Sequence, residues 1–323
     1  MTTFLTLTLH PAVDRIVEVE RLIPGALLDG RLLKRVPAGK GVNTARVLRR
    51  VLGPRAKVLA AAWLGTNEVS LAARSLAAEG IELAVARRSC PTRICTTYLE
   101  RLGGRETHVK ESMPAPSRTE CSELLHMAAR LPVELGCAAV CGSAPPQTPA
   151  RTLRAVLAAL RAHARVLLAD TNGPLLEWAS KSGLDGIKGN AQEIGALLKL
   201  RGPLDPSKRA HAQALRALPA RRGGPKAVLV TASSDAAWLA TREGLWRAKP
   251  PVLPTSRRRS ATGCGDAATA GWMWAWSQGL EPDEALRLAV ACGSAKFASA
   301  DPGAVEVRLA RRLSAQIEVR REQ

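Results

Sequence analysis

The stretch SATGCGDAATAG, residues 260–271, places one carboxylate, Asp266, among glycines and other small residues. Small residues on both sides indicate a backbone that a ligand approaches closely. The apolar sequence that follows predicts a buried helix, entered by a loop of Gly263, Cys264 and Gly265. A helix start presents unpaired N–H groups and the positive end of the helix dipole, which suits an anion. A glycine-rich turn capped by Asp266 is the alternative interpretation.

Around this stretch, strand-like and helix-like segments alternate over most of the chain. Because the strand-like runs are continuously apolar, we expect an α/β fold, with a central, mostly parallel sheet covered by helices on both faces. Ligands of such sheets bind beyond the carboxyl ends of the strands, so residues that follow strands are site candidates. The predicted strands are 4–9, 57–64, 137–142, 165–170, 185–188 and 227–231, and the clearest helical segments are 68–79, 149–163 and 190–199.

Two intervals interrupt this alternation with short alternating strands. The first contains RIVEVERL (15–22) and LLKRV (32–36), and the second, RICTTYLERLGGRETHVK (93–110), contains a Gly-Gly turn. We interpret them as a small β lid over about 12–38 and 87–112, inserted into a single domain that spans the whole chain.

The composition limits the class of protein. The 323 residues are 46% hydrophobic, which is enough for a large core. The first residues lack the pattern of a signal peptide, and no apolar run approaches the length of a membrane span, so we expect a soluble, cytoplasmic protein with no membrane partner. The seven cysteines form no CxxC pair and no ligand spacing with the five histidines, which argues against a zinc site or a disulfide framework.

The net charge of +19 raises the question of a nucleic-acid partner, because arginine binds phosphate well. One tyrosine and two phenylalanines offer little surface for base stacking, and the arginines are scattered along helical segments. A basic surface that attracts small anionic ligands is therefore the preferred interpretation.

Two further motifs carry polar side chains near predicted element ends. PAGKGVNTARVL (37–48) combines glycines that permit close backbone approach with a lysine charge and the Asn43 amide, a pattern that suits an anion or a sugar. A solvated loop is its alternative interpretation. KGNAQE (188–193) places Asn190 and Glu193 three residues apart, which fits a water-coordinated Mg²⁺ and, more simply, a helix capping box.

Taken in order, the motifs resemble those of the ribokinase-like PfkB family of carbohydrate kinases. TLHPAVD (8–14) is similar to TLNPAxD, PAGKGVNTARVL to GGKGxNxARxL, CGSAPP (141–146) to SGSLPP, DTNGPLL (170–176) to DxSGxxL, KGNAQE to KPNxxE and TGCGDAATAG (262–271) to GAGDxxxAG. The GKGxNxAR form resembles the branch that acts on phosphorylated ketohexoses, the 1-phosphofructokinase and tagatose-6-phosphate kinase group. The resemblance covers essentially the whole chain and implies a ribokinase-like fold.

The resemblance implies a role for each matching residue. Asp266 would be the general base of a phosphoryl transfer. The backbone N–H groups of Gly263, Cys264 and Gly265 would form the anion hole. The residues implied for the sugar phosphate are Asp14, Gly39, Lys40, Asn43, Arg93 and Ser143. Those implied for the nucleotide are Lys188, Asn190, Thr231, Gly263 and Gly265, with Glu193 and, through water, Asn190 for Mg²⁺.

The implied activity is ATP- and Mg²⁺-dependent phosphorylation of a primary hydroxyl of a ketohexose phosphate, which converts fructose 1-phosphate to fructose 1,6-bisphosphate. Tagatose 6-phosphate and fructose 6-phosphate are alternative substrates, and a homodimer formed through the lid is a further expectation. Lys40 and Arg93 disfavour a kinase of unphosphorylated sugars or nucleosides, because two cations suit a substrate that already carries phosphate. A non-catalytic binder of sugar phosphate or nucleic acid is the alternative of another class; Asp266, Asn190 and Glu193 argue against it.

Several positions depart from the family pattern. ASSDAA (232–237) lacks the glycines that the family usually has in the loop after Thr231, which leaves ATP affinity and base preference open. Ala38 replaces the first glycine of GGKG, Gly189 replaces a proline and Cys264 replaces an alanine of the anion hole. Cys264 would contribute mainly its backbone, so we expect catalysis to survive this replacement.

Overall fold

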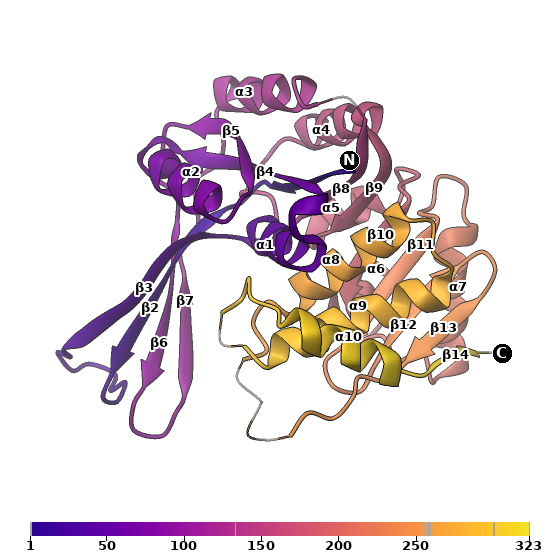
Figure 1. Cartoon of the computed structure of the whole chain (residues 1–323). Coiled ribbons are helices and arrows are strands. Elements are labelled where there is room, and N and C mark those ends of the chain that lie inside the picture. Colours follow the sequence, from indigo (N-terminus) through magenta and orange to yellow (C-terminus); the bar gives the residue numbers. More distant parts are fainter. Residues whose placement is uncertain (1, 133, 255, 257–259, 300, 323) are drawn as a thin grey trace.

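The computed structural model describes the chain except residues 1, 133, 255, 257–259, 300 and 323. Its main element is a ten-stranded sheet (Figure 1). In spatial order the strands are β14 (Val319–Glu322), β13 (Leu245–Ala248), β12 (Ala236–Thr241), β11 (Ala227–Ala232), β10 (Gly186–Asn190), β9 (Ala164–Asp170), β8 (Leu135–Cys141), β1 (Thr3–Thr8), β4 (Lys57–Gly65) and β5 (Glu82–Arg88). All neighbours from β11 to β5 pair in parallel, and β12 to β14 add antiparallel pairs at one end.

Helices cover both faces of this sheet, because successive side chains of each strand point to opposite faces and both sets are apolar. In β1, Phe4 belongs to one core cluster, and Leu5 and Leu7 belong to the other. The helices on the Phe4 face are α1 (Lys40–Leu52), α2 (Val69–Ala78), α8 (Cys264–Ser277), α9 (Pro282–Phe297) and α10 (Val307–Gln316). Those on the other face are α3 (Arg118–Ala129), α4 (Ala150–His163), α5 (Gly173–Ala179), α6 (Ala191–Leu197) and α7 (Arg209–Ala220). Two short 3₁₀ turns lie at Gly53–Arg55 and Thr66–Glu68.

This architecture confirms the predicted α/β fold. Each strand predicted from an apolar run is present with its ends shifted by at most about two residues, and the predicted buried helix after the glycine loop is α8. The sequence analysis did not predict β5, the antiparallel strands β12 to β14, or helices α3, α5, α7, α9 and α10. Within the part of the chain that the structure describes, none of the helices combines the length and hydropathy that a membrane span requires.

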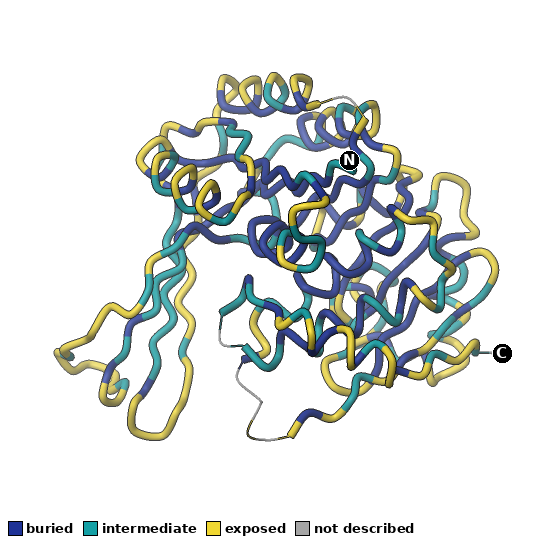
Figure 2. Tube along the Cα trace, viewed as in Figure 1, coloured by how far each residue is buried: buried dark blue, intermediate teal, exposed yellow. Residues whose placement is uncertain are grey.

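A second sheet of four strands projects from the main body (Figure 1). Its strands, in spatial order, are β3 (Gly30–Ala38), β2 (Ala12–Val19), β6 (Ile94–Glu100) and β7 (Glu106–Lys110). They lie within the two ranges that the sequence analysis assigns to a lid, and Figure 2 shows that much of this sheet is only partly buried. Because β2 follows β1 and β3 leads into α1, the sheet starts at the carboxyl end of β1.

Candidate active site

The anion-hole loop enters α8 through a backbone conformation that requires glycine. Gly263, the N-cap residue, has φ of 88°, and a Cβ on it would lie 2.4 Å from the Pro302 oxygen. In the described residues, the N–H groups of Gly263 and Gly265 donate to no protein acceptor, whereas the Cys264 N–H donates to the Ala261 oxygen at 3.2 Å. The hole predicted from three N–H groups is thus available from Gly263 and Gly265, and the third is engaged in a turn.

Asp266, in the first turn of α8, is buried and has a single side-chain donor facing it in the described chain. The Asn43 amide Nδ2 donates to Asp266 Oδ2 at 2.9 Å. Burial, together with the negative charge of Asp170, raises the pKa of Asp266 to about 6. A carboxylate with this pKa is ionised at neutral pH and accepts a proton more readily than an ordinary aspartate, as a general base requires. The resemblance assigned Asn43 to sugar hydroxyls; here its amide donates to the Asp266 carboxylate.

This pKa predicts how turnover depends on pH. If Asp266 is the general base, its protonation abolishes transfer, and because the pKa of Asp266 is about 6, kcat should be constant above about pH 7 and fall roughly tenfold per pH unit below about pH 5.5. The measurement is a kcat profile at saturating substrates from about pH 5 to 8.5, with circular dichroism at each pH as the control for folding. A constant kcat down to about pH 5 in folded enzyme would contradict the prediction.

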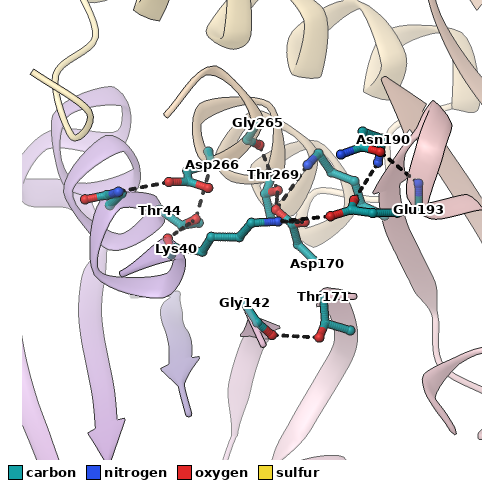
Figure 3. A network of polar contacts seen from close by, with 12 residues as sticks. Lys40, Thr44, Gly142, Asp170, Thr171, Asn190, Glu193, Gly265, Asp266 and Thr269 are labelled. Atoms are coloured by element: carbon teal, nitrogen blue, oxygen red, sulfur yellow. Dashed lines mark hydrogen bonds and ion pairs between the residues drawn. The ribbon is translucent and has the colours of Figure 1, made fainter. Parts of the chain in front are cut away.

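Asp170, the last residue of β9, forms ion pairs with both Lys40 and Lys188 (Figure 3). Lys40 Nζ lies 3.3 Å from Asp170 Oδ1, and Lys188 Nζ lies 3.1 Å from Oδ2. The Thr269 hydroxyl donates to the same Oδ2 at 2.6 Å. These partners outweigh the effect of burial and hold the pKa of Asp170 at about 2. The charge of Asp170 in turn raises the pKa of Lys40, so the Asp170 carboxylate and the Lys40 ammonium are both ionised at neutral pH.

The ammonium groups of Lys40 and Lys188 lie near the start of α8, where the sequence predicts an anion hole. A Cβ on Gly265 would lie 3.4 Å from Lys188 Nζ, so this cation is adjacent to the start of α8. Lys40 Nζ is also 4.0 Å from Glu193 Oε1. The resemblance assigned Lys40 to the sugar phosphate; in this structure its ammonium donates to Asp170, and Lys40 and Lys188 line the same cavity. The arrangement offers two positive charges and a helix N-terminus to one anionic group.

A cavity of about 650 Å³ opens from this cationic end. Its polar wall contains Lys40, Lys188, Asn190, Glu193 and Thr231. Its lining also includes apolar side chains, namely Pro250, Pro251, Val252, Leu253, Val290 and Phe297. A cavity lined by both cations and apolar side chains suits a nucleotide, because its phosphates need the first and its base needs the second. The volume is typical of small-molecule sites.

Asn190 and Glu193 form the capping box of α6 that the sequence analysis favoured. Asn190 Oδ1 accepts from the Glu193 N–H at 2.8 Å, and Glu193 Oε2 accepts from the Asn190 N–H at 2.7 Å. Glu193 Oε1 remains directed to the cavity near Lys40. No cluster of three or more metal-ligating side chains exists among the described residues. One carboxylate oxygen fits a Mg²⁺ that keeps water ligands and is held mainly by phosphate oxygens.

The loop after Thr231 tolerates the loss of glycine. Ser233 adopts φ of 48°, in the left-handed region that favours glycine, and Ser233 and Ser234 line the cavity. A non-glycine residue in this region costs roughly 1–2 kcal/mol. The turn therefore keeps a glycine-type backbone with a serine, and Ser233 and Ser234 add polar groups to the lining of the cavity.

The residues implied for the sugar lie where the second sheet meets the main sheet. Asp14 in β2 is half-buried, and burial raises its pKa. Arg93 donates from Nη2 to the His10 oxygen at 2.9 Å and from Nε to the Pro11 oxygen at 3.2 Å, so backbone oxygens fix its guanidinium. The Ser143 hydroxyl lies 3.4 Å from His10 Nδ1. The backbone of Gly39, with φ of 124°, completes this region at the N-terminus of α1.

The sequence analysis gave no role to Asp170 or His10, although both lie in the site. His10 is buried, and burial together with Arg93 and Arg88 lowers its pKa to about 4, so the ring is neutral at neutral pH. The available signal was their position: Asp170 ends the predicted strand 165–170, and His10 directly follows the predicted strand 4–9. Residues at the carboxyl ends of parallel strands face the ligand side.

Known proteins resemble this chain over most of its length. The family model described as pfkB family carbohydrate kinase matches residues 9–306. The 1-phosphofructokinase of Rhodobacter capsulatus is 33% identical over 298 residues, which cover 88% of this chain and 87% of that protein. The 1-phosphofructokinase of Bacillus subtilis (strain 168) is 28% identical over 307 residues, which cover 93% and 94%. The solved structure of the tetrameric inhibited form of phosphofructokinase-2 from Escherichia coli has a TM-score of 0.86, covers 98% of this chain and 99% of that chain, and is 19% identical. This likeness confirms the expected fold.

Proposed function

This chain belongs to the pfkB family of carbohydrate kinases, and from this premise we propose that it transfers the γ-phosphoryl group of ATP to fructose 1-phosphate. The product is fructose 1,6-bisphosphate, and tagatose 6-phosphate and fructose 6-phosphate are the alternative acceptors. The acceptor is inferred from relatives named 1-phosphofructokinase. The observation that carries the chemistry is the position of Asp266, a buried base with a raised pKa at the helix start that Lys188 adjoins.

In the proposed transfer, Asp266 accepts a proton and the cations stabilise negative charge. The free primary hydroxyl of the sugar phosphate attacks the γ-phosphorus and gives its proton to Asp266. The bond between the γ-phosphorus and the β–γ bridging oxygen breaks, and ADP leaves with the electron pair. The N–H groups of Gly263 and Gly265 and the dipole of α8 stabilise the transferred phosphoryl oxygens, with Lys40 and Lys188 opposing the accumulated negative charge.

Mg²⁺ is proposed as the companion of ATP. Glu193 would hold it through Oε1, and Asn190 through a water molecule, at the polar wall of the cavity. When bound, the ion neutralises charge on the phosphate oxygens. Thr231 and the apolar side chains of the lining, such as Val290, would hold the nucleoside. Asp14, Gly39, Asn43, Arg93 and Ser143 are proposed to bind the sugar phosphate.

The proposal is tested by ATP consumption against fructose 1-phosphate, tagatose 6-phosphate, fructose 6-phosphate and fructose. We expect the highest kcat/KM with fructose 1-phosphate. Arg93→Ala should lower this value by about 10–100-fold, the scale of a lost charge-assisted hydrogen bond, and should change the value for fructose less than about threefold. Arg87→Ala, an exposed arginine of β5, is the control. No turnover on any of the four, combined with tight DNA binding at physiological salt, would overturn the kinase proposal in favour of a nucleic-acid function.

The second sheet supports a proposal on assembly, namely a homodimer formed through the lid. Leu32 and Leu33 of β3 and Val109 of β7 are large apolar side chains with exposed fractions of 52%, 42% and 52%. They lie on the two edge strands of the second sheet, and exposed apolar side chains of this size can mark an interaction surface. Sedimentation equilibrium should give twice the mass of the chain, and Leu33→Asp should shift the population to monomer. A monomer at concentrations of about 50 μM would exclude a specific dimer of useful stability.

A further inference from the structure

Lys296, in the last turn of α9, is a buried cation that the proposed chemistry does not use. Its exposed fraction is 0%. Its Nζ donates to two backbone oxygens, Ser260 O at 3.0 Å and Ser299 O at 2.9 Å. Among the described residues, no carboxylate lies within ion-pair distance of this ammonium, and burial lowers the pKa of Lys296, with the charges of Asp301 and Asp266 acting in the opposite direction. Burying an ammonium that only carbonyl oxygens bind costs desolvation free energy. The presence of Lys296 at this position therefore requires a functional explanation.

The two carbonyl oxygens belong to the segments that form and support the anion hole. Ser260 precedes the turn into α8, and Ser299 follows α9, where its hydroxyl accepts from the Asp301 N–H at 3.1 Å. The two segments touch directly, because a Cβ on Gly263 would lie 2.4 Å from the Pro302 oxygen. The ammonium therefore joins the turn before the anion hole to the segment on which that turn rests.

Asp301, in the segment after α9, also binds the second sheet. Asp301 Oδ2 lies 2.6 Å from Lys34 Nζ of β3, in the second sheet. The Asp301 Oδ1 accepts from the Gly303 N–H at 3.1 Å. The segment that follows α9 thus makes two bonds. Asp301 binds Lys34 of the second sheet, and the Ser299 oxygen accepts from Lys296, which also binds the turn before α8.

We infer that Lys296 is a positioning residue, a built-in cation that holds the anion-hole turn in the geometry needed for phosphoryl transfer. The inference rests on the proposed kinase function. N–H donors stabilise a developing charge only when they are aimed at the place it will occupy, so a small displacement of the turn lowers turnover. Without the ammonium, the oxygens of Ser260 and Ser299 lose their buried donor, and the turn loses its bond to its support.

The test begins with the wild-type kcat on the sugar phosphates, because an inactive wild type refutes the kinase proposal and not this inference. Lys296→Met keeps the side-chain length and removes the charge. We expect kcat to fall about 10²-fold, the scale of a lost anion-hole donor, with KM for both substrates changed less than about threefold. Lys208→Met, at an exposed position before α7, is the matched control and should keep wild-type kinetics.

Restoring kcat with added ammonium distinguishes a positioning role of the cation from a general loss of packing. Lys296→Ala leaves space between the two carbonyl oxygens, and about 50 mM ammonium should raise its kcat at least about tenfold by occupying that space, whereas the larger tetramethylammonium should not. A folded Lys296→Met with kcat within about threefold of wild type, or no rescue by ammonium, overturns the inference. If neither variant folds, Lys296→Gln decides, because its amide keeps N–H donors and removes the charge: a lower kcat at unchanged Tm supports the inference, and a wild-type kcat overturns it.

Discussion

Asp266→Asn should lower kcat by about 10²–10⁴-fold while the protein stays folded. The amide has the same shape, and its oxygen can still accept from the Asn43 amide, but it cannot take the proton of the attacking hydroxyl. Binding of the sugar phosphate and of ATP should change little, so the loss should appear in kcat and not in KM. Steady-state kinetics of freshly purified variant, with isothermal titration for binding, measure both.

The effect on stability has the opposite sign. The folded-state pKa of Asp266 is about 6, above the ordinary value of 3.8, so its contribution to stability is fully present below about pH 4 and is lost as pH rises through about 6. At pH 7.5 the ionised carboxylate therefore destabilises the fold, and Asp266→Asn should have an unchanged or higher Tm. Glu284→Gln, the same neutralisation at an exposed site in the first turn of α9, is the control. Wild-type kcat in Asp266→Asn would refute the assignment of the base.

The predictable part of the site was local. Gly263 and Asp266 could be recognised from one segment, because a glycine turn that opens a buried helix has a characteristic sequence and a fixed direction of its N–H groups. The same holds for Asn190 and Glu193, whose capping box is formed by residues three apart. The parallel sheet was predictable because its strands are short apolar runs.

The unpredicted part depends on contacts between distant segments. Lys40 is drawn to Asp170, 130 positions away, and the Lys296 ammonium meets the oxygen of Ser260, 36 positions away. No local pattern encodes which charge meets which. Strand β5 was missed because its sequence, ELAVARR, carries charged residues at both ends and its central residues are only partly buried. It lies at the edge of the main sheet, where strands need not be continuously apolar.

Asp170→Asn should be the most destabilising of the proposed single substitutions. The carboxylate of Asp170 is the shared partner of Lys40 and Lys188, and Lys188 is almost completely buried. Removing one partner of a buried ion pair leaves an uncompensated charge and typically costs about 3–5 kcal/mol of the free energy of unfolding. Urea denaturation at pH 7 measures this change. Asp283→Asn is the control, because its carboxylate lies 3.8 Å from Arg287 at a half-exposed site, where a pair contributes at most about 1 kcal/mol.

The pH dependence and a second substitution test the cause of this loss. The folded-state pKa of Asp170 is about 2, below its ordinary value of 3.8, so its stabilising effect is present above about pH 4 and is lost only as pH falls through about 2. The difference between wild type and Asp170→Asn should therefore be constant from about pH 7 to 5. Adding Lys188→Met should recover part of the lost stability, because it removes the charge left unpaired. A loss below about 1 kcal/mol, or a double variant less stable than Asp170→Asn, would show that the carboxylate does not hold the two cations at the anion hole.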